Sequence, residues 1–191
     1  MNRRAIVYSL VVAAVTATLG CGPPWQVVKQ AAPNPFLGKK AFGALPMDYT
    51  GMEIGGKTEA EYVADKDADS RQKWEGDKGA IAGNYVGQLI GKASEAGIQV
   101  TPGPGEFIVK PRTVFVEPGI YTAIYNKASQ LRVNVQVTDA QGAVLDEFIV
   151  KSATAADFGN ISSGQRLRKD AENVGRYSGM YLQSRVSPKK E

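Results

Sequence analysis

The chain has 191 residues, of which 43% are hydrophobic and 22% are charged, and its formal net charge is +4. This balance is typical of a folded globular domain and excludes both a disordered chain and a protein with many membrane spans. The single cysteine excludes an intrachain disulfide, and the lack of histidine removes the commonest general base and metal ligand. Lysine and arginine form no cluster interleaved with aromatic residues, so we expect no nucleic-acid partner.

The first 20 residues have the organisation of an export signal. Two arginines form a basic head, an uncharged and mostly apolar run follows, and a small residue, Gly20, precedes the only cysteine, Cys21. The apolar run is shorter than the roughly 20 residues that a membrane-spanning helix needs. We therefore expect residues 1–20 to be a signal peptide.

This signal resembles that of bacterial lipoproteins, whose cysteine is lipidated and becomes the first residue of the mature protein. The resemblance implies that Cys21 is a lipidation site and that acyl chains on it hold the protein at a membrane. Thr18 and Leu19 depart from the commonest lipoprotein signal, which has Leu or Val and then a small residue at these positions. The alternative is an ordinary secretory signal, but a secreted protein seldom keeps one unpaired thiol.

Residues 21–40 are expected to form the lipidated N-terminus and a tether. Prolines favour an extended link in this range, at Pro23, Pro24, Pro33 and Pro35. A single domain at 41–186 and a short tail at 187–191 complete the predicted organisation. The residue after the cysteine is Gly22 and not Asp, which by resemblance to enterobacterial sorting implies the outer membrane, with the domain facing the periplasm.

The domain is expected to begin with a short strand and a short helix. The strand covers 41–47, and Pro46 places it at an edge or an end of a sheet. Thr58 and Glu61 have the spacing of a capping box, which predicts a short helix from there to about Lys66.

A long helix is predicted over about 70–96, with Gly97 as its C-terminal cap. Beside its apolar face runs a stripe of glycines at every fourth position. Each glycine costs a helix about 0.8–1 kcal/mol relative to alanine, so we expect close approach of another backbone to offset this cost. A glycine zipper in a membrane or an oligomer is the alternative, although polar residues interrupt the segment. The apolar face is Ala82, Val86, Leu89, Ile90 and Ala93, and the stripe is Gly79, Gly83, Gly87 and Gly91.

The middle of the domain is predicted to be antiparallel sheet. Strands are expected at 106–117 and 120–126, separated by a Pro-Gly turn, because both are rich in β-branched and aromatic residues. Residues 131–137 alternate apolar and polar side chains and are expected to pair with 143–151 in a hairpin.

A final helix is predicted from about Gly164 to Ser184, after a capping box of Ser162 and Gln165. It also has small residues at every fourth position, namely Ala171, Gly175 and Gly179. We expect the two long helices to pack on each other on one face of the sheet. The predicted fold is therefore α+β, with an antiparallel sheet of about five strands and two long helices on one face.

The chain offers little for catalysis. Nucleophilic chemistry needs a serine or cysteine with a positioned base, and histidine is absent. Two groups of carboxylates remain, an alternating cluster at Asp65, Asp67 and Asp69 and the neighbours Asp146 and Glu147. The cluster lacks the glycine and distal glutamate of a calcium-binding loop, and we interpret it as a solvated helix end. We expect no catalytic, cofactor-binding or metal-binding residue and no enzyme activity.

The C-terminal part of the chain combines strands, a hairpin and the start of a final helix, at 132–139 (RVNVQVTD), Gly142, Val144, Leu145 and 164–167 (GQRL). This order looks like that of uncharacterised bacterial envelope lipoproteins and is generally similar to small α/β lipoproteins of envelope assembly machines. The resemblance covers less than half of the chain. It implies a non-catalytic, periplasm-facing domain that binds protein partners, with no family site residues to transfer.

Three functions are compatible with this pattern. We expect a lipid-anchored structural or adaptor protein, which a filled core with an exposed sheet edge or apolar patch would favour. The alternative is a lipoprotein that binds a small hydrophobic or glycan ligand between helices and sheet, for which a deep apolar pocket with convergent polar groups is expected. A hydrolase would require two carboxylates that face each other in a cleft.

Overall fold

The structure is a computed structural model that describes residues 22–122 and 124–188. The expected signal peptide and Cys21 lie outside the described residues. Within them, no helix is long and apolar enough to cross a bilayer. The elements in chain order are β1 (Trp25–Lys29), β2 (Ala41–Ala44), β3 (Glu53–Ile54), β4 (Lys57–Thr58), α1 (Glu59–Ala64), α2 (Ala68–Ser94), β5 (Gln99–Pro102), β6 (Phe107–Glu117), β7 (Ile120–Tyr121), β8 (Asn126–Lys127), β9 (Ser129–Asp139), β10 (Val144–Thr154) and α3 (Ser163–Val186).

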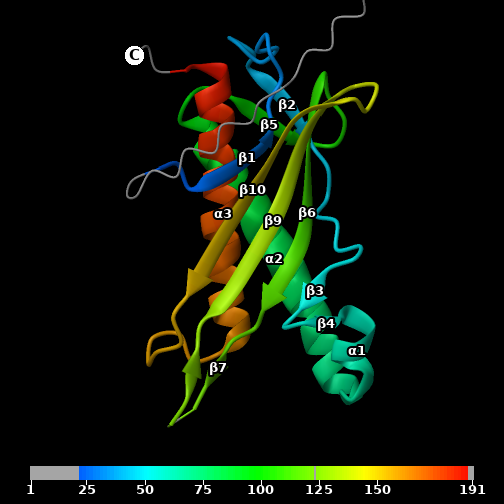
Figure 1. The fold of residues 1–191 in the computed structure, drawn as a ribbon, viewed down its shortest axis with the longest axis vertical. Coiled ribbons are helices and arrows are strands. Elements are labelled where there is room, and N and C mark those ends of the chain that lie inside the picture. Colours follow the sequence, from blue (N-terminus) through cyan, green and yellow to red (C-terminus); the bar gives the residue numbers. More distant parts are fainter. Residues whose placement is uncertain (1–21, 123, 189–191) are drawn as a thin grey trace, which may run out of the picture.

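A mixed sheet carries the two long helices, α2 and α3, on one face (Figure 1). Its main path runs β1-β10-β9-β6-β2-β5, and β3 and β4 join it beside β6, which gives eight strands. The α+β class is confirmed, but the sheet has more strands than the expected number of about five. The short helix predicted after Thr58 is α1, the third helix of the fold. The core lies between the helices and the sheet.

The predicted hairpin is confirmed as the centre of the sheet. β9 and β10 pair antiparallel, with Val133 opposite Val150 and Val135 opposite Phe148. All four of these side chains are fully buried, because every second residue of each strand faces the helices. Asp139 closes the turn, since its carboxylate accepts hydrogen bonds from the backbone N–H groups of the residues two and four further on.

The helix ends also follow the sequence signals. Thr58 and Glu61 form the reciprocal capping box that begins α1. Gly97 has a φ of 67°, and the N–H of Ile98 donates to the carbonyl oxygen of Ala93, so that the glycine ends α2 in the left-handed conformation. Ser162 accepts from the N–H of Gln165 and begins α3.

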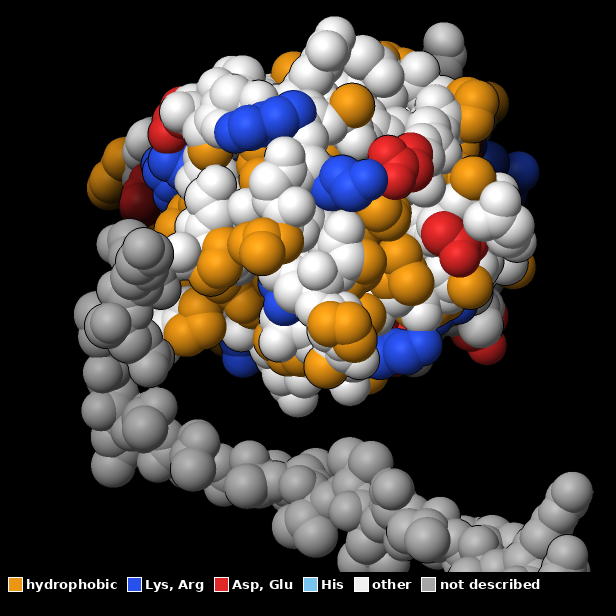
Figure 2. Space-filling model, turned by 90° about the horizontal axis from the view of Figure 1, so that it is seen from above, with side chains coloured by type: hydrophobic (Ala, Val, Ile, Leu, Met, Phe, Trp, Pro, Cys, Tyr) orange, Lys and Arg blue, Asp and Glu red, His pale blue; other side chains and the backbone are white. Residues whose placement is uncertain are grey.

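Part of the segment expected to be a tether is a strand of the sheet. Trp25–Lys29, inside the range assigned to the tether, is the edge strand β1 and pairs antiparallel with β10. Further along, Phe36 is 1% exposed and packs against the ring of Phe107. Proline content predicts extended backbone correctly here, but pairing with β10 and the rings of Trp25 and Phe36 attach that backbone to the domain. Figure 2 looks onto the end of the molecule that carries this loop and shows apolar side chains among scattered charged ones.

Two other strands differ from expectation. Ala41–Ala44 is an internal strand and not an edge, because β2 lies parallel to both β6 and β5. The strand predicted at 120–126 is not found in the main sheet. Ile120–Tyr121 (β7) instead pairs with Asn126–Lys127 (β8) in a short two-stranded arm, which extends beyond the lower end of the sheet (Figure 1). The sequence pattern shows strand character but not which strand is the partner.

Candidate functional site

An apolar groove lies between helix α2 and the segment that follows strand β2. Its volume is about 560 Å³, within the roughly 300–1,000 Å³ of natural small-molecule sites. No lining residue is charged. The groove is lined by Ala44, Leu45, Pro46, Met47, Ala82, Gly83, Tyr85, Val86, Leu89, Pro102, Gly103 and Pro111.

The glycine stripe of α2 does not pack against a neighbour, and one of its members, Gly83, borders the groove. The expectation of a close backbone contact is wrong for all four glycines, since a Cβ added at any of them would meet no atom within 4 Å. The buried side of α2 is turned away from the stripe and consists of Trp74, Ile81, Tyr85, Leu89 and Ala93. Gly83 is therefore a part of the groove wall that has no side chain, and a larger residue there would fill the groove.

The opposite wall is held by backbone hydrogen bonds to strand β6. The N–H of Leu45 donates to the carbonyl oxygen of Val109, and the N–H of Asp48 donates to that of Pro111, each at 2.9 Å. Leu45 nevertheless keeps 37% of its surface exposed. Because the backbone is satisfied and the side chains are apolar, the groove offers contact area with few directional groups. Such a surface suits an apolar segment better than a polar substrate.

The floor of the groove includes the buried ring of Tyr85. Its hydroxyl points into the core and donates to Ser178 Oγ at 3.1 Å, so it is not available to a molecule in the groove. Burial raises the pKa of Tyr85 above its ordinary value, and the hydrogen bond to Ser178 opposes only part of this effect. Tyr85 therefore stays protonated and contributes a neutral ring.

The carboxylates considered for catalysis do not form a pair. Asp146 and Glu147 project from opposite faces of the sheet, because successive strand residues alternate. Asp146 is fully buried and accepts hydrogen bonds from Tyr181 Oη at 2.6 Å and Arg185 Nε at 2.7 Å. Glu147 lies on the other face and accepts one from Asn134 Nδ2 at 2.7 Å.

The alternating aspartates stand at the start of helix α2. Asp67 is the N-cap and accepts the N–H of Ser70 at 2.7 Å, and this hydrogen bond lowers the pKa of Asp67. A cap of this kind stabilises the helix end, so the residue has a structural role. In residues 22–122 and 124–188, no three acidic or cysteine side chains are grouped to hold a metal ion.

A second buried carboxylate, Asp170, joins helix α3 to the sheet. It accepts hydrogen bonds from the hydroxyls of Ser129, Ser152 and Thr154 at 2.6, 2.8 and 2.8 Å. Burial raises the pKa of Asp170, and the three hydroxyls act in the opposite direction. All its partners belong to the protein itself, so Asp170 stabilises the packing of α3.

A second apolar surface lies at the tip of the β7–β8 arm and the neighbouring loop. Ile124 is 98% exposed and Phe158 is 90% exposed, although large apolar side chains are usually buried. Tyr121 and Phe158 contact each other edge to face, with ring centroids 6.1 Å apart, and join the arm to the loop. We call this surface the arm tip. It lies at the opposite end of the molecule from the loop that follows β1 (Figure 1).

No family model matches the chain, and the curated proteins contain no match. Among solved structures, the PelC dodecamer from Paraburkholderia phytofirmans aligns with a TM-score of 0.49 and 9% identity, over 85% of this chain and 97% of that chain. A minor lipoprotein from Acinetobacter baumannii aligns with a TM-score of 0.40 and 11% identity, over 78% and 93%. A hypothetical protein from Chlamydia trachomatis gives 0.43 and 12%, over 79% and 99%. At these scores the similarities assign neither a family nor an activity.

The predicted site residue, Cys21, lies outside the described residues, so its lipidation stays a prediction. The groove was not predicted, although its signal is present in the sequence. The apolar row expected to face the core contains Ala82, Val86 and Ile90, which are only half-buried, while the fully buried row starts one residue earlier at Ile81. Helix α2 thus has more apolar surface than the core covers, and part of the remainder, at Ala82 and Val86, lines the groove.

Proposed function

We propose that this chain is a membrane-anchored, non-catalytic lipoprotein of the bacterial envelope that acts as a structural or adaptor component. Acyl chains on Cys21 hold it at the membrane, at the periplasmic side of the outer membrane. It binds a protein partner, and the open apolar groove beside α2 is the observation that carries this proposal. The arm tip supplies a second apolar contact surface.

The chemistry of the groove indicates what part of a partner it takes. Its walls carry no charge, and Gly83 exposes helical backbone without a side chain. A second helix can approach the backbone at Gly83 closely, as small residues allow in other helix pairs. We therefore expect the partner to insert an apolar helical segment, with polar or charged residues only at its margins.

The test uses the full-length lipidated protein in its native membranes, with a photo-crosslinking residue at Val86. The expected result is a discrete protein adduct that Gly83→Leu abolishes, because leucine at this position fills the groove. Gly87→Leu is the matched control, since Gly87 is equally open but does not line the groove. An adduct that survives Gly83→Leu, or that both variants abolish equally, contradicts the groove as the binding site.

The volume of the groove also favours a second candidate function, the binding of a small hydrophobic ligand. In that case, native mass spectrometry of the gently extracted protein detects a bound apolar molecule that Gly83→Leu displaces and Gly87→Leu retains. A photo-adduct of small-molecule mass, in place of a protein adduct, supports binding of a small hydrophobic ligand.

A further inference from the structure

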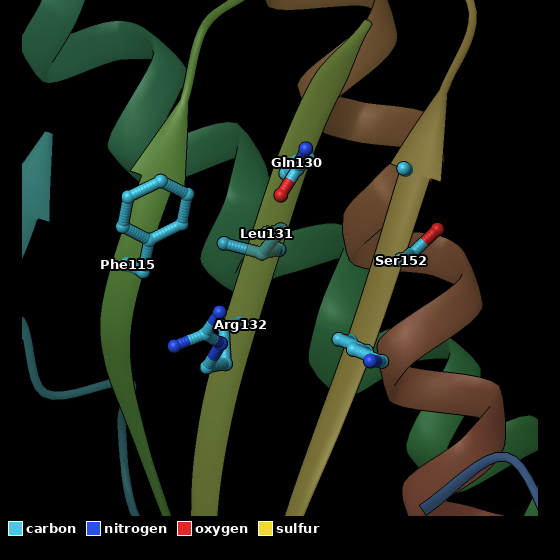
Figure 3. A pocket seen from close by; sticks show the side chains of 7 residues that line it. Phe115, Gln130, Leu131, Arg132 and Ser152 are labelled. Atoms are coloured by element: carbon cyan, nitrogen blue, oxygen red, sulfur yellow. The ribbon is translucent and has the colours of Figure 1, made fainter. Parts of the chain in front are cut away.

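The face of the sheet opposite the helices carries an unbalanced group of basic residues. In Figure 3 the helices lie behind the strands, and Phe115 and Arg132 lie on the side away from them. The outward positions of β6, β9 and β10 include four basic side chains, which we call the basic cluster. Three of them are exposed and Lys110 is half-buried, and the cluster consists of Lys110, Arg112, Arg132 and Lys151.

Two members of the basic cluster stand directly opposite each other. Arg132 of β9 and Lys151 of β10 are cross-strand partners, and both border a hollow of about 360 Å³. Like charges in this arrangement destabilise a sheet. Within the described part of the chain, none of the four cluster residues takes part in an ion pair. The arrangement therefore favours an external anion that neutralises both charges.

The acidic side chains near the basic cluster offset its charge only in part, and Asp48 lies beside Arg112. Glu147 lies on the same face but accepts its hydrogen bond from Asn134. Asp48 borders a neighbouring hollow together with Lys110 and Arg112, and its own carboxylate accepts the N–H of Thr50. Glu53 of β3 is separated from Arg132 by Phe115, its cross-strand neighbour. Within the described residues neither Glu53 nor the pair of Arg132 and Lys151 takes part in an ion pair.

The basic cluster is also close to the expected anchor. Trp25 in β1 is the cross-strand partner of Val150, the residue next to Lys151. Only four residue steps separate Trp25 from Cys21, and this span is at most about 14 Å for an extended chain. A lipid on Cys21 therefore keeps the β1 edge of the sheet, which is next to Lys151 of β10, close to the membrane surface.

We propose that the outer face of β6, β9 and β10 docks on the anionic phospholipid headgroups of the membrane that holds Cys21. The proposal rests on lipidation of Cys21 as part of the proposed function. Basic side chains on a flat surface are attracted to anionic headgroups, and the short link keeps them within range. Helices α2 and α3 then lie on the side of the sheet away from the bilayer.

The test measures lysine accessibility in the full-length lipidated protein. The protein is reconstituted in vesicles of phosphatidylcholine alone, or of equal parts phosphatidylcholine and phosphatidylglycerol, and treated with a water-soluble amine-reactive reagent. We expect modification of Lys110 and Lys151 to fall about threefold or more in the anionic vesicles and to recover at high salt. Lys73, an exposed residue of α2, serves as the internal control and keeps its reactivity.

Variants separate docking from other causes. Arg112→Gln combined with Arg132→Gln removes two exposed charges, so the fold remains intact and the protection of Lys151 is lost. Arg168→Gln, an exposed residue of α3, is the matched control and leaves the protection unchanged. Equal reactivity of Lys151 in both kinds of vesicle overturns the proposal.

A soluble polyanion and two control measurements distinguish the remaining explanations. Protection of Lys151 by dextran sulfate in neutral vesicles, without protection by phosphatidylglycerol, assigns the face to a soluble polyanion and overturns membrane docking. The intact mass of the same sample reports acylation, and the groove crosslink is measured separately. Failure of docking in an acylated, crosslinking-competent protein therefore leaves the proposed adaptor function standing.

Discussion

Gly175 of α3 lies against the backbone of Tyr85 in α2. A Cβ built on Gly175 would stand 2.3 Å from the Tyr85 carbonyl oxygen, which is closer than real Cβ atoms approach. One turn later, a Cβ on Gly179 would stand 3.0 Å from the carbonyl oxygen of Leu89. The glycines of α3 therefore permit the close contact between the two helices, whereas those of α2 do not take part in it.

Gly175→Ala is expected to destabilise the protein by about 1–3 kcal/mol, because the added methyl group forces the helices apart. Gly83→Ala is the matched control, since it places the same methyl group in open space. It is expected to stabilise the protein by up to about 1 kcal/mol through the higher helix propensity of alanine. Urea denaturation of both variants measures these changes. A Gly175→Ala protein as stable as the wild type contradicts the contact.

The sequence predicted where the helices and strands lie better than which of them pack against each other. The periodicity of 131–137 and the capping signals at Thr58 and Gly97 depend on local interactions, and the structure confirms them. Whether the glycines of α2 face the other helix depends on how α2 is rotated about its own axis. The buried apolar row begins at Ile81 and not at Ala82, and this shift of one residue leaves Gly83 beside an open groove. A single sequence does not show which of the two rows is buried.

The same limit explains why the edge strand β1 and the role of the buried carboxylate of Asp146 were not predicted. Trp25 belongs to the sheet through its pairing with Val150 of β10. Its ring also packs on Tyr181 of α3, with centroids 5.7 Å apart, and Tyr181 is 156 residues further along the chain. The role of Asp146 likewise depends on Arg185, which local patterns do not connect with it. Signals for long-range pairs are absent from local periodicity, so neither the edge strand nor the partners of Asp146 were predicted.

Asp146→Asn is expected to destabilise the protein by about 3–5 kcal/mol, because it leaves the largely buried Arg185 guanidinium without its countercharge. Asp146 also accepts the N–H of Ala31 at 2.8 Å, so the loop after β1 should exchange its amide hydrogens faster in the variant. Urea denaturation and hydrogen exchange measure the two effects. Glu95→Gln is the control, since the Lys92–Glu95 pair is exposed and contributes at most about 1 kcal/mol. Similar losses in the two variants contradict this role of Asp146.

Stability is expected to fall at alkaline pH. Burial raises the pKa of Tyr49, Tyr85 and Tyr181 above the ordinary value, and for Tyr181 the hydrogen bond to Asp146 adds to this effect. Above about pH 10 the unfolded chain releases these protons while the folded chain retains them. The unfolded state then binds fewer protons, so the free energy of unfolding falls by about 1.4 kcal/mol per pH unit for each tyrosine.

Urea midpoints between about pH 8 and about pH 11 measure this dependence. Tyr85→Phe removes one of the three groups without changing the ring that packs in the core. Its midpoint should decline less steeply with pH than that of the wild type, even where its stability at neutral pH is lower. Parallel pH profiles for the two proteins contradict the contribution of Tyr85.

Cys21→Ser is expected to abolish incorporation of radiolabelled acyl chains and to release the protein from membranes, because each buried CH₂ of an acyl chain contributes about 0.8 kcal/mol and two or more chains make attachment stable. Membrane fractionation and the intact mass of the mature protein measure both effects. The short connection to β1 adds a control. A flexible insertion between Gly22 and Pro23 should preserve acylation and membrane attachment, while it removes the restriction on how the sheet faces the bilayer. A wild-type protein that takes up no acyl label contradicts the lipoprotein assignment, and a Cys21→Ser protein that still takes it up contradicts Cys21 as the modified residue.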